Sequence, residues 1–394
     1  MSKLGRLMSL DALRGLDMFW IVGGDRIIRG VAKASDIPVL NALARQFSHV
    51  EWEGFRFYDL IFPLFLFMIG VSIPYAFERR LERGEKLRSI YRHILLRVVT
   101  LFIMGLMVNG NLLTYDIGKI QIYSVLQMLA LGYFFASVFY LHMGWQGQLA
   151  VTVLMLAGYW ALLAFVPGPG HVIGEVAPQC NVGDWLNDLL LGAWQGRFRF
   201  GWILATLGHA STAMLGVFAA RVLRSARLTP YGKFKWLGAM GAVCLLAGIV
   251  WGGWLARWLP GLELWGVEWN DWPIWSRIIK RRWTSGYVLY AGGWSYLMLA
   301  SFYLVIDVWG ARRWCRPFVV IGTQALFAYM VCMLGRKALN AVAGIFLNGL
   351  AQYTGAWQEP LTAAGAFAVL WFLLWHVDRF KRRADILRDD FKLS

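Results

Sequence analysis

Long apolar runs recur along the chain, and short polar or charged connections separate them. A transmembrane helix needs about 20 mostly apolar residues. The pattern therefore predicts an all-α polytopic membrane protein with about ten transmembrane helices. The expected spans lie near residues 12–30, 59–78, 93–110, 121–141, 148–166, 202–221, 236–256, 284–307, 317–335 and 361–378. A further apolar region at 338–352 is short, and it could form a re-entrant or interfacial helix, or an eleventh span.

The first expected span is the weakest of the ten. Arg14, Asp17, Asp25 and Arg26 interrupt it, and an ionisable side chain at the centre of a membrane helix costs about 2.5–3.5 kcal/mol on insertion scales. Since no small-residue cleavage site follows this run, we expect a retained membrane helix rather than a cleaved signal peptide. We predict a single transmembrane domain over residues 1–394, with no separate soluble domain.

The composition supports a membrane protein. The 394 residues are 58% hydrophobic and 16% charged, whereas soluble domains are about 45–50% apolar and about 25% charged. The net charge of +16 would suit a nucleic-acid partner, but the Lys and Arg residues lie in short blocks between apolar runs. There they set topology and contact anionic lipid, so we expect a lipid bilayer and no nucleic acid as partner. The four cysteines form no CxxC pair and predict neither a disulfide framework nor a metal site.

The distribution of positive charge predicts the orientation of the chain. If the N-terminus is cytoplasmic, most Lys and Arg residues fall on the cytoplasmic side, near 79–97, 221–235, 308–316 and after 379. This bias favours both termini in the cytoplasm. The same threading places His49 on the opposite side of the membrane.

Three ionisable residues near the outer ends of the first two spans are candidates for chemistry. His49 lies in a loop, where a lone histidine is usually a surface residue, but histidine is the side chain that suits proton transfer near neutral pH. Asp59 could pair with His49 or Arg56, or could cap the second span. Asp25 follows two glycines. It could orient a histidine, or it could be a helix-end charge paired with an arginine one or four residues further on.

Other polar residues could contact an anionic ligand or could serve helix packing. Arg14 could bind an anionic ligand from the cytoplasm, or pair with the aspartate three residues before it. Arg97 lies in an apolar helix start, where a snorkelling side chain is the alternative. Ser124 and Gln127 belong to a polar cluster that could form interhelical hydrogen bonds. Lys280 is one of three basic residues before the eighth span, which could bind an anionic ligand or anchor the chain at the interface.

Four stretches of the sequence carry a resemblance to a known family. The pattern S-x-D-x-x-R-G begins at Ser9, and HVEWEGFRFYDLIFPLFLFMIGVS begins at His49. SVLQMLALGYF at 124–134 and WTSGYVLYAGGWSYLMLASFYLVID at 283–307 follow. Together they resemble the heparan-α-glucosaminide N-acetyltransferase family of transmembrane acyltransferases, including its bacterial members. The resemblance extends over about residues 6–335.

The resemblance implies a reaction and the residues that carry it. The family transfers acetyl from cytoplasmic acetyl-CoA to a sugar amine across the membrane. Its catalytic histidine stands ten residues before the aspartate of the D-L-x-F-P motif, which matches His49 before Asp59. Its second catalytic position is an asparagine eleven residues after the motif arginine, and counting from Arg14 gives Asp25. An acid there could hold His49 in one tautomer, but it is a poorer donor to an oxyanion than an amide.

We therefore expect a transmembrane acetyltransferase that uses acetyl-CoA as co-substrate and no metal. Its acceptor would be an amino sugar or other glycan on the periplasmic side of a bacterial inner membrane. His49 would act as general base or carry the acetyl group covalently, assisted by Asp25 and Asp59. The residues expected to bind the donor are Arg14, Arg97, Ser124, Gln127 and Lys280.

Two other functions stay open. One is a proton-coupled transporter or flippase of a sugar or glycan precursor, with Asp25 and His49 as a proton relay. The other is a non-catalytic membrane subunit of a sugar-uptake system. The sequence halves lack the symmetry that transporters often show, and a subunit would have no need for His49. The chain could also form a homodimer.

Overall fold

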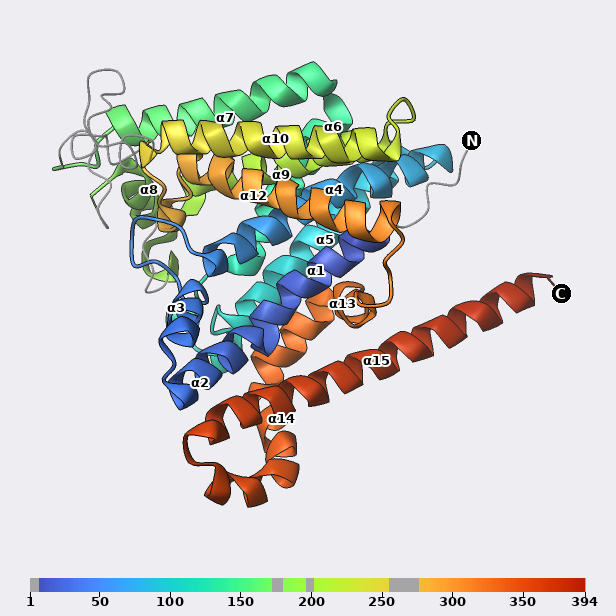
Figure 1. Ribbon diagram of the computed structural model, residues 1–394. Helices are drawn as coiled ribbons and strands as arrows, with labels where there is room; N and C mark the ends of the chain where they lie inside the picture. Colours follow the sequence, from blue (N-terminus) through green and yellow to red (C-terminus); the bar gives the residue numbers. More distant parts are fainter. Residues whose placement is uncertain (1–6, 172–179, 196–201, 255–275, 394) are drawn as a thin grey trace. The chain divides into compact units, whose positions relative to one another are not determined.

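The computed structural model describes residues 7–171, 180–195, 202–254 and 276–393, and in these ranges the chain is helical with no β-strand (Figure 1). The α-helices are α1 Met8–Phe19, α2 Asp25–Ser35, α3 Pro38–Gln46, α4 Phe57–Glu82, α5 Leu87–Val108, α6 Val125–His142, α7 Trp145–Phe165, α8 Val182–Leu191, α9 Trp202–Arg224, α10 Pro230–Trp251, α12 Ser285–Phe302, α13 Arg316–Gly322, α14 Ala325–Thr354 and α15 Gln358–Leu393. Two π-helical segments, η1 Trp20–Gly24 and η7 Tyr303–Val308, continue α1 and α12. Short 3-10 turns are η2 Leu112–Thr114, η3 Ile117–Lys119, η4 Gly192–Gln195, η6 Lys280–Arg282 and η8 Gly355–Trp357.

The predicted fold class, an all-α polytopic membrane protein, is confirmed. Within the described ranges, nine helices are long and apolar enough to cross a membrane, and they correspond to the second through tenth predicted spans. The first predicted span differs. Its residues are helical, but they divide into α1, η1 and α2, because the backbone leaves helical geometry at Gly23. This break and the charged side chains around it explain why the segment is not one straight apolar helix.

The region 338–352 does not form a helix of its own. It is the second half of α14, a continuous helix of 30 residues. No proline occurs between Pro317 and Pro360 to end it. The predicted span 317–335 is correspondingly misplaced, since the helix break falls at Thr323 and Gln324, between α13 and α14.

Contacts divide the chain into two compact units. The first comprises Met1–His49, Arg56–Ile61 and Phe302–Ser394, and the second comprises Val50–Phe55 and Phe62–Ser301. Helix α4 begins in the first unit and continues in the second. The single transmembrane domain over residues 1–394 stays a prediction.

The first unit is built on a close contact between α1 and α13, which lie side by side in Figure 1. A Cβ atom on Gly15 would overlap the carbonyl oxygen of Phe318, and one on Gly322 would overlap the carbonyl oxygen of Asp11. Small residues of this kind let membrane helices approach backbone to backbone. Helix α14 packs along α15 in the same unit (Figure 1).

Replacement of Gly322 by alanine is expected to destabilise the first unit, because the new methyl group can fit only if α1 and α13 separate. Overpacking of this kind costs about 1–3 kcal/mol. Thermal unfolding in detergent should therefore show a lower Tm. The control is Gly238→Ala in α10, where a Cβ would meet nothing within 4 Å. Equal Tm values for Gly322→Ala and wild type would refute the close contact.

The second unit is organised around α9. Gly70 of α4 meets the backbone of Ala213, and Gly216 of α9 meets the backbone of Phe67. Helices α6 and α7 pack on the same helix. Arg282 is buried and forms two 2.7 Å bonds with the Asp184 carboxylate. Arg282 is one of the three basic residues before the eighth predicted span that could have bound an anionic ligand. In the structure its guanidinium is paired with Asp184 instead.

Candidate functional site

His49 and Asp59 meet where the loop after α3 enters α4. The Nδ1 atom of His49 lies 2.8 Å from Oδ1 of Asp59. The His49 side chain is 54% exposed, whereas that of Asp59 is fully buried. A proton on Nδ1, donated to the carboxylate, places the basic lone pair on Nε2. The pair therefore combines an accessible imidazole with a buried carboxylate, which is the pairing of Asp59 with His49 that the sequence left open beside pairing with Arg56.

Asp59 is held by the beginning of α4 as well as by His49. Its Oδ2 accepts a hydrogen bond from the backbone N–H of Arg56 at 3.1 Å, and its own N–H donates to the Arg56 carbonyl at 2.9 Å. This reciprocal arrangement is a helix N-terminal cap. The Arg56 guanidinium donates to Ser48 Oγ at 2.6 Å and to the His49 carbonyl at 3.1 Å. The capping and pairing alternatives for Asp59 therefore both occur, one on each carboxylate oxygen.

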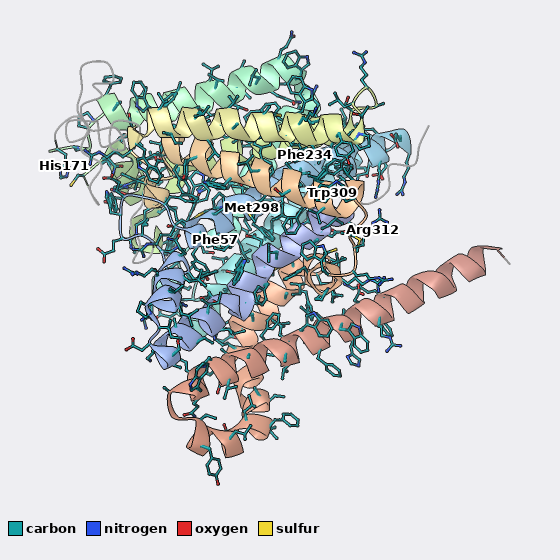
Figure 2. The ribbon with its side chains drawn as sticks, viewed as in Figure 1. Phe57, His171, Phe234, Met298, Trp309 and Arg312 are labelled. Carbon is teal, nitrogen blue, oxygen red and sulfur yellow. The ribbon has the colours of Figure 1, made fainter. Side chains whose placement is uncertain are left out.

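Tyr58 is a site residue that the sequence reasoning missed. It follows Phe57, the first residue of α4 and one of the labelled side chains in Figure 2. Its ring lies 4.9 Å from that of His49, centroid to centroid. Its hydroxyl lies near the Asp25 carboxylate and interacts with it electrostatically. Tyr58 thus connects two residues predicted separately, and its position directly before Asp59 was the only signal for it.

Asp25 is the first residue of α2 and is buried directly after η1. Its Oδ2 lies 2.6 Å from Nη2 of Arg29, so the helix-end pair with the arginine four residues on is present. The structure gives the carboxylate partner of His49 Nδ1 as Asp59. Asp25 therefore pairs with Arg29 and lies near Tyr58, and its predicted catalytic role beside His49 stays a prediction.

A cavity of about 1060 Å³ opens at the other end of α1, also in the first unit. Its lining residues come from α1, α13, α15, the connection that carries Trp309 and Arg312 in Figure 2, and the turn between α13 and α14. They are Met8, Asp11, Arg313, Arg316, Pro317, Val319, Val320, Thr323, Gln324, Trp371, Trp375, Asp378, Arg379 and Lys381. Four of these side chains are basic and two are acidic. Arg14 forms a 3.4 Å ion pair with one of the acids, Asp11. The predicted donor residue Arg14 therefore adjoins the cavity through that pair.

The other predicted donor-binding residues belong to the second unit. Gln127 of α6 is buried, accepts a hydrogen bond from Ser124 and donates to the Phe102 carbonyl of α5 at 3.2 Å. These bonds match the helix-packing alternative. The guanidinium of Arg97 lies 4.5 Å from the centroid of the Tyr133 ring. Lys280 opens η6, beside the buried Arg282. Donor binding by these four residues stays a prediction.

Comparison with known proteins finds a matching family model and similar curated acetyltransferases. A family model described as a domain of unknown function, DUF5009, matches residues 6–171. This range contains His49, Asp59 and Asp25. The heparan-alpha-glucosaminide N-acetyltransferase of Mus musculus is 25% identical over 392 residues, covering 84% of this chain and 53% of the relative. The protein of the same name from Homo sapiens is 26% identical over 388 residues, covering 82% and 52%. The resemblance expected from the motifs is confirmed, and the chain spans about half the length of these curated relatives.

Proposed function

We propose, from the resemblance to the heparan-α-glucosaminide N-acetyltransferases, that this multi-pass membrane protein is itself an acetyltransferase. It would move acetyl from cytoplasmic acetyl-CoA to an amino sugar or other glycan acceptor on the far side of a bacterial inner membrane. The observation that carries the proposal is the His49–Asp59 pair, at 2.8 Å, with an exposed base and a buried acid. This pair is the arrangement that general-base catalysis requires.

The chemistry follows from the two nitrogens of His49. Nε2 takes a proton from the acceptor amine or hydroxyl as that group attacks the thioester carbonyl, and Asp59 stabilises the resulting imidazolium through Nδ1. A bond forms between the acceptor and the carbonyl carbon, while the carbon–sulfur bond breaks and its electron pair leaves on the CoA thiolate. The imidazolium proton then neutralises the thiolate. In the covalent variant, Nε2 itself attacks and carries the acetyl group before the acceptor does.

Tyr58 offers the donor that Asp25 lacks. A charged carboxylate cannot donate a hydrogen bond to the oxyanion that forms on the thioester carbonyl, whereas a phenolic hydroxyl can. The Tyr58 hydroxyl is held beside Asp25, and its ring lies against His49. We therefore assign oxyanion stabilisation to Tyr58. Because a phenol donates a single proton, its hydroxyl must turn from Asp25 to the oxyanion as the acceptor attacks.

Replacement of Tyr58 by phenylalanine is expected to lower kcat about 10- to 100-fold, the loss expected when a hydrogen bond to a charged group is removed. The ring and its contact with His49 persist, so binding of CoA should change little. Initial rates and CoA titrations measure the two effects separately. Tyr115→Phe is the control, because Tyr115 is 92% exposed. A wild-type kcat in Tyr58→Phe would remove Tyr58 from the reaction.

The basic cavity at the start of α1 suits the charged end of the donor. Arg313, Arg316, Arg379 and Lys381 supply phosphate-binding groups there. Asp11 at the cavity and Asp25 at the site are 14 positions apart along α1, η1 and α2. At about 1.5 Å per helical residue this separation is roughly 20 Å. An elongated donor with phosphates at one end and a thioester at the other matches such a distance.

One test decides the proposal. The purified full-length chain is mixed with acetyl-CoA labelled in the acetyl group and with a panel of amino sugars, and transfer and CoA binding are both measured. We expect binding of CoA, and either acetyl transfer or slow thioester hydrolysis. Absence of both turnover and CoA binding would refute an acetyltransferase.

One observation favours a second candidate, proton-coupled transport. Asp17 of α1 is buried, and neither of its carboxylate oxygens has a hydrogen-bond partner among the described residues. Ionisable groups within a membrane often belong to proton pathways. Proteoliposomes loaded with a pH-sensitive dye test it. Sugar-driven acidification without acetyl-CoA, lost in Asp17→Asn, would support transport.

A further inference from the structure

A second cavity, in the second unit, is not used by the proposed reaction. It has a volume of about 530 Å³ and lies at the ends of α4, α6 and α9, three candidate membrane spans. Its lining residues are Pro74, Glu78, Tyr140, Val217, Arg221, Arg224, Ser225, Ala226 and Arg227. Three of them are arginines and one is an acid, so the lining is positively charged.

The single acid of this cavity is already neutralised. Glu78 forms an ion pair with Arg224 and accepts a hydrogen bond from the Tyr140 hydroxyl. Arg224 also donates to the Pro74 carbonyl at 2.9 Å, and its side chain is only 15% exposed. Its Nε atom is buried without a hydrogen-bond partner among the described residues. Arg224 is therefore a fixed structural cation that retains one unused donor.

The two remaining arginines keep their charge. Arg221 donates to the amide oxygen of Gln148 at 3.3 Å, which is a neutral group. Arg227 is exposed and forms no ion pair with any residue that the structure describes. The helix dipole explains basic residues in the last turn of α9, where Arg221 and Arg224 lie. It explains neither Arg227, beyond the helix end, nor a cavity among the three side chains.

We propose that this cavity binds a phosphate group. The planar guanidinium fork matches phosphate oxygens in pairs, and two uncompensated arginines match the charge of a phosphate ester. The volume falls in the range of small-ligand sites, about 300–1,000 Å³. The cavity lies where membrane helices end, and basic pockets between such ends bind anionic lipid head groups. The phosphate can come from a phospholipid head group or from solution.

Native mass spectrometry of the full-length chain in detergent tests the site. Phosphatidylglycerol, phosphatidylcholine and inorganic phosphate are titrated separately into wild type, Arg221→Gln, Arg227→Gln and Arg83→Gln. Arg83 is the matched control, because it is exposed in the connection after α4 and does not line the cavity. We expect phosphatidylglycerol or inorganic phosphate to bind at least about tenfold more weakly to each cavity variant, as loss of a charge-assisted hydrogen bond implies. Arg83→Gln should bind like wild type.

A further titration, of inorganic phosphate into wild type that already holds phosphatidylglycerol, identifies the source of the phosphate. Binding of phosphatidylglycerol that inorganic phosphate does not displace assigns the site to a lipid head group, and competition by inorganic phosphate assigns it to a soluble ligand. Both results support the proposal. Equal weakening in Arg83→Gln, or no difference among the four proteins, would overturn it. Arg224→Gln is avoided, since Arg224 holds Glu78 and Pro74 in place. Unchanged Tm values would show that the exposed variants are folded.

Discussion

Replacement of His49 by alanine is expected to lower kcat/KM for acetyl transfer by about 10²- to 10⁴-fold, the range that a positioned general base contributes. The variant loses the basic Nε2 atom, and the buried Asp59 carboxylate loses its partner at 2.8 Å. CoA binding should persist, because His49 lies at the acceptor end of the proposed site and the basic cavity adjoins the start of α1. The measurement pairs initial rates with a CoA titration.

The control for this prediction is His171→Ala. His171 is an exposed histidine of the second unit and is labelled in Figure 2. The His171→Ala variant should transfer acetyl at the wild-type rate. If His49→Ala retained wild-type kcat/KM, His49 would be neither base nor acetyl carrier. Mass spectrometry after a single turnover distinguishes the general base from the acetyl carrier, since only a carrier becomes an acetylated histidine.

Replacement of Asp59 by asparagine is expected to lower kcat by about 10²- to 10⁴-fold, with folding largely retained. The amide keeps the shape of the side chain and can still accept the Arg56 N–H at the start of α4. It removes the negative charge that stabilises the His49 imidazolium. In serine proteases the equivalent Asp-to-Asn change lowers kcat by about 10⁴-fold through the wrong histidine tautomer, and that value is the upper end of our range.

Asp36→Asn is the matched control for Asp59→Asn. Asp36 is exposed and has a φ of 50°, a backbone conformation that asparagine also adopts readily. Its activity and Tm should equal those of wild type. If Asp59→Asn leaves kcat unchanged, the charge of Asp59 has no part in the reaction and Asp59 serves only as the helix cap, which the amide retains. That outcome would remove the acid from the proposed mechanism.

Hydropathy located the membrane helices well, because the signal is long and repeated. Hydropathy did not predict two helix breaks, because a change in backbone geometry, and not a change in composition, produces them. Gly23 divides the first predicted span, and the turn at Thr323 and Gln324 separates α13 from α14. Neither break involves a proline within the segment, and proline is the residue that most clearly signals one.

The candidate site shows a similar division. The His49–Asp59 pair was one of the alternatives that the sequence offered, because a loop and the helix that it enters are neighbours in the chain. Tyr58 was missed because a tyrosine at a membrane helix end is ordinarily an interfacial anchor. Its interaction with Asp25 depends on where α2 begins after the break at η1, which no local pattern reports. Ser124 and Gln127 were polar enough to suggest a ligand, but only tertiary structure shows their bonds to each other and to α5.

The ion pair between Arg282 and Asp184 has a consequence for how the protein is made. The two residues are 98 positions apart in the chain, so Asp184 is synthesised long before its partner. At about 5–20 residues per second, the interval is roughly 5–20 s. A lone carboxylate is not stable in the buried position that it finally occupies. The contact between α8 and η6 must therefore form late in synthesis, after the ribosome has added Arg282. A nascent chain stopped before that residue should leave Asp184 open to water.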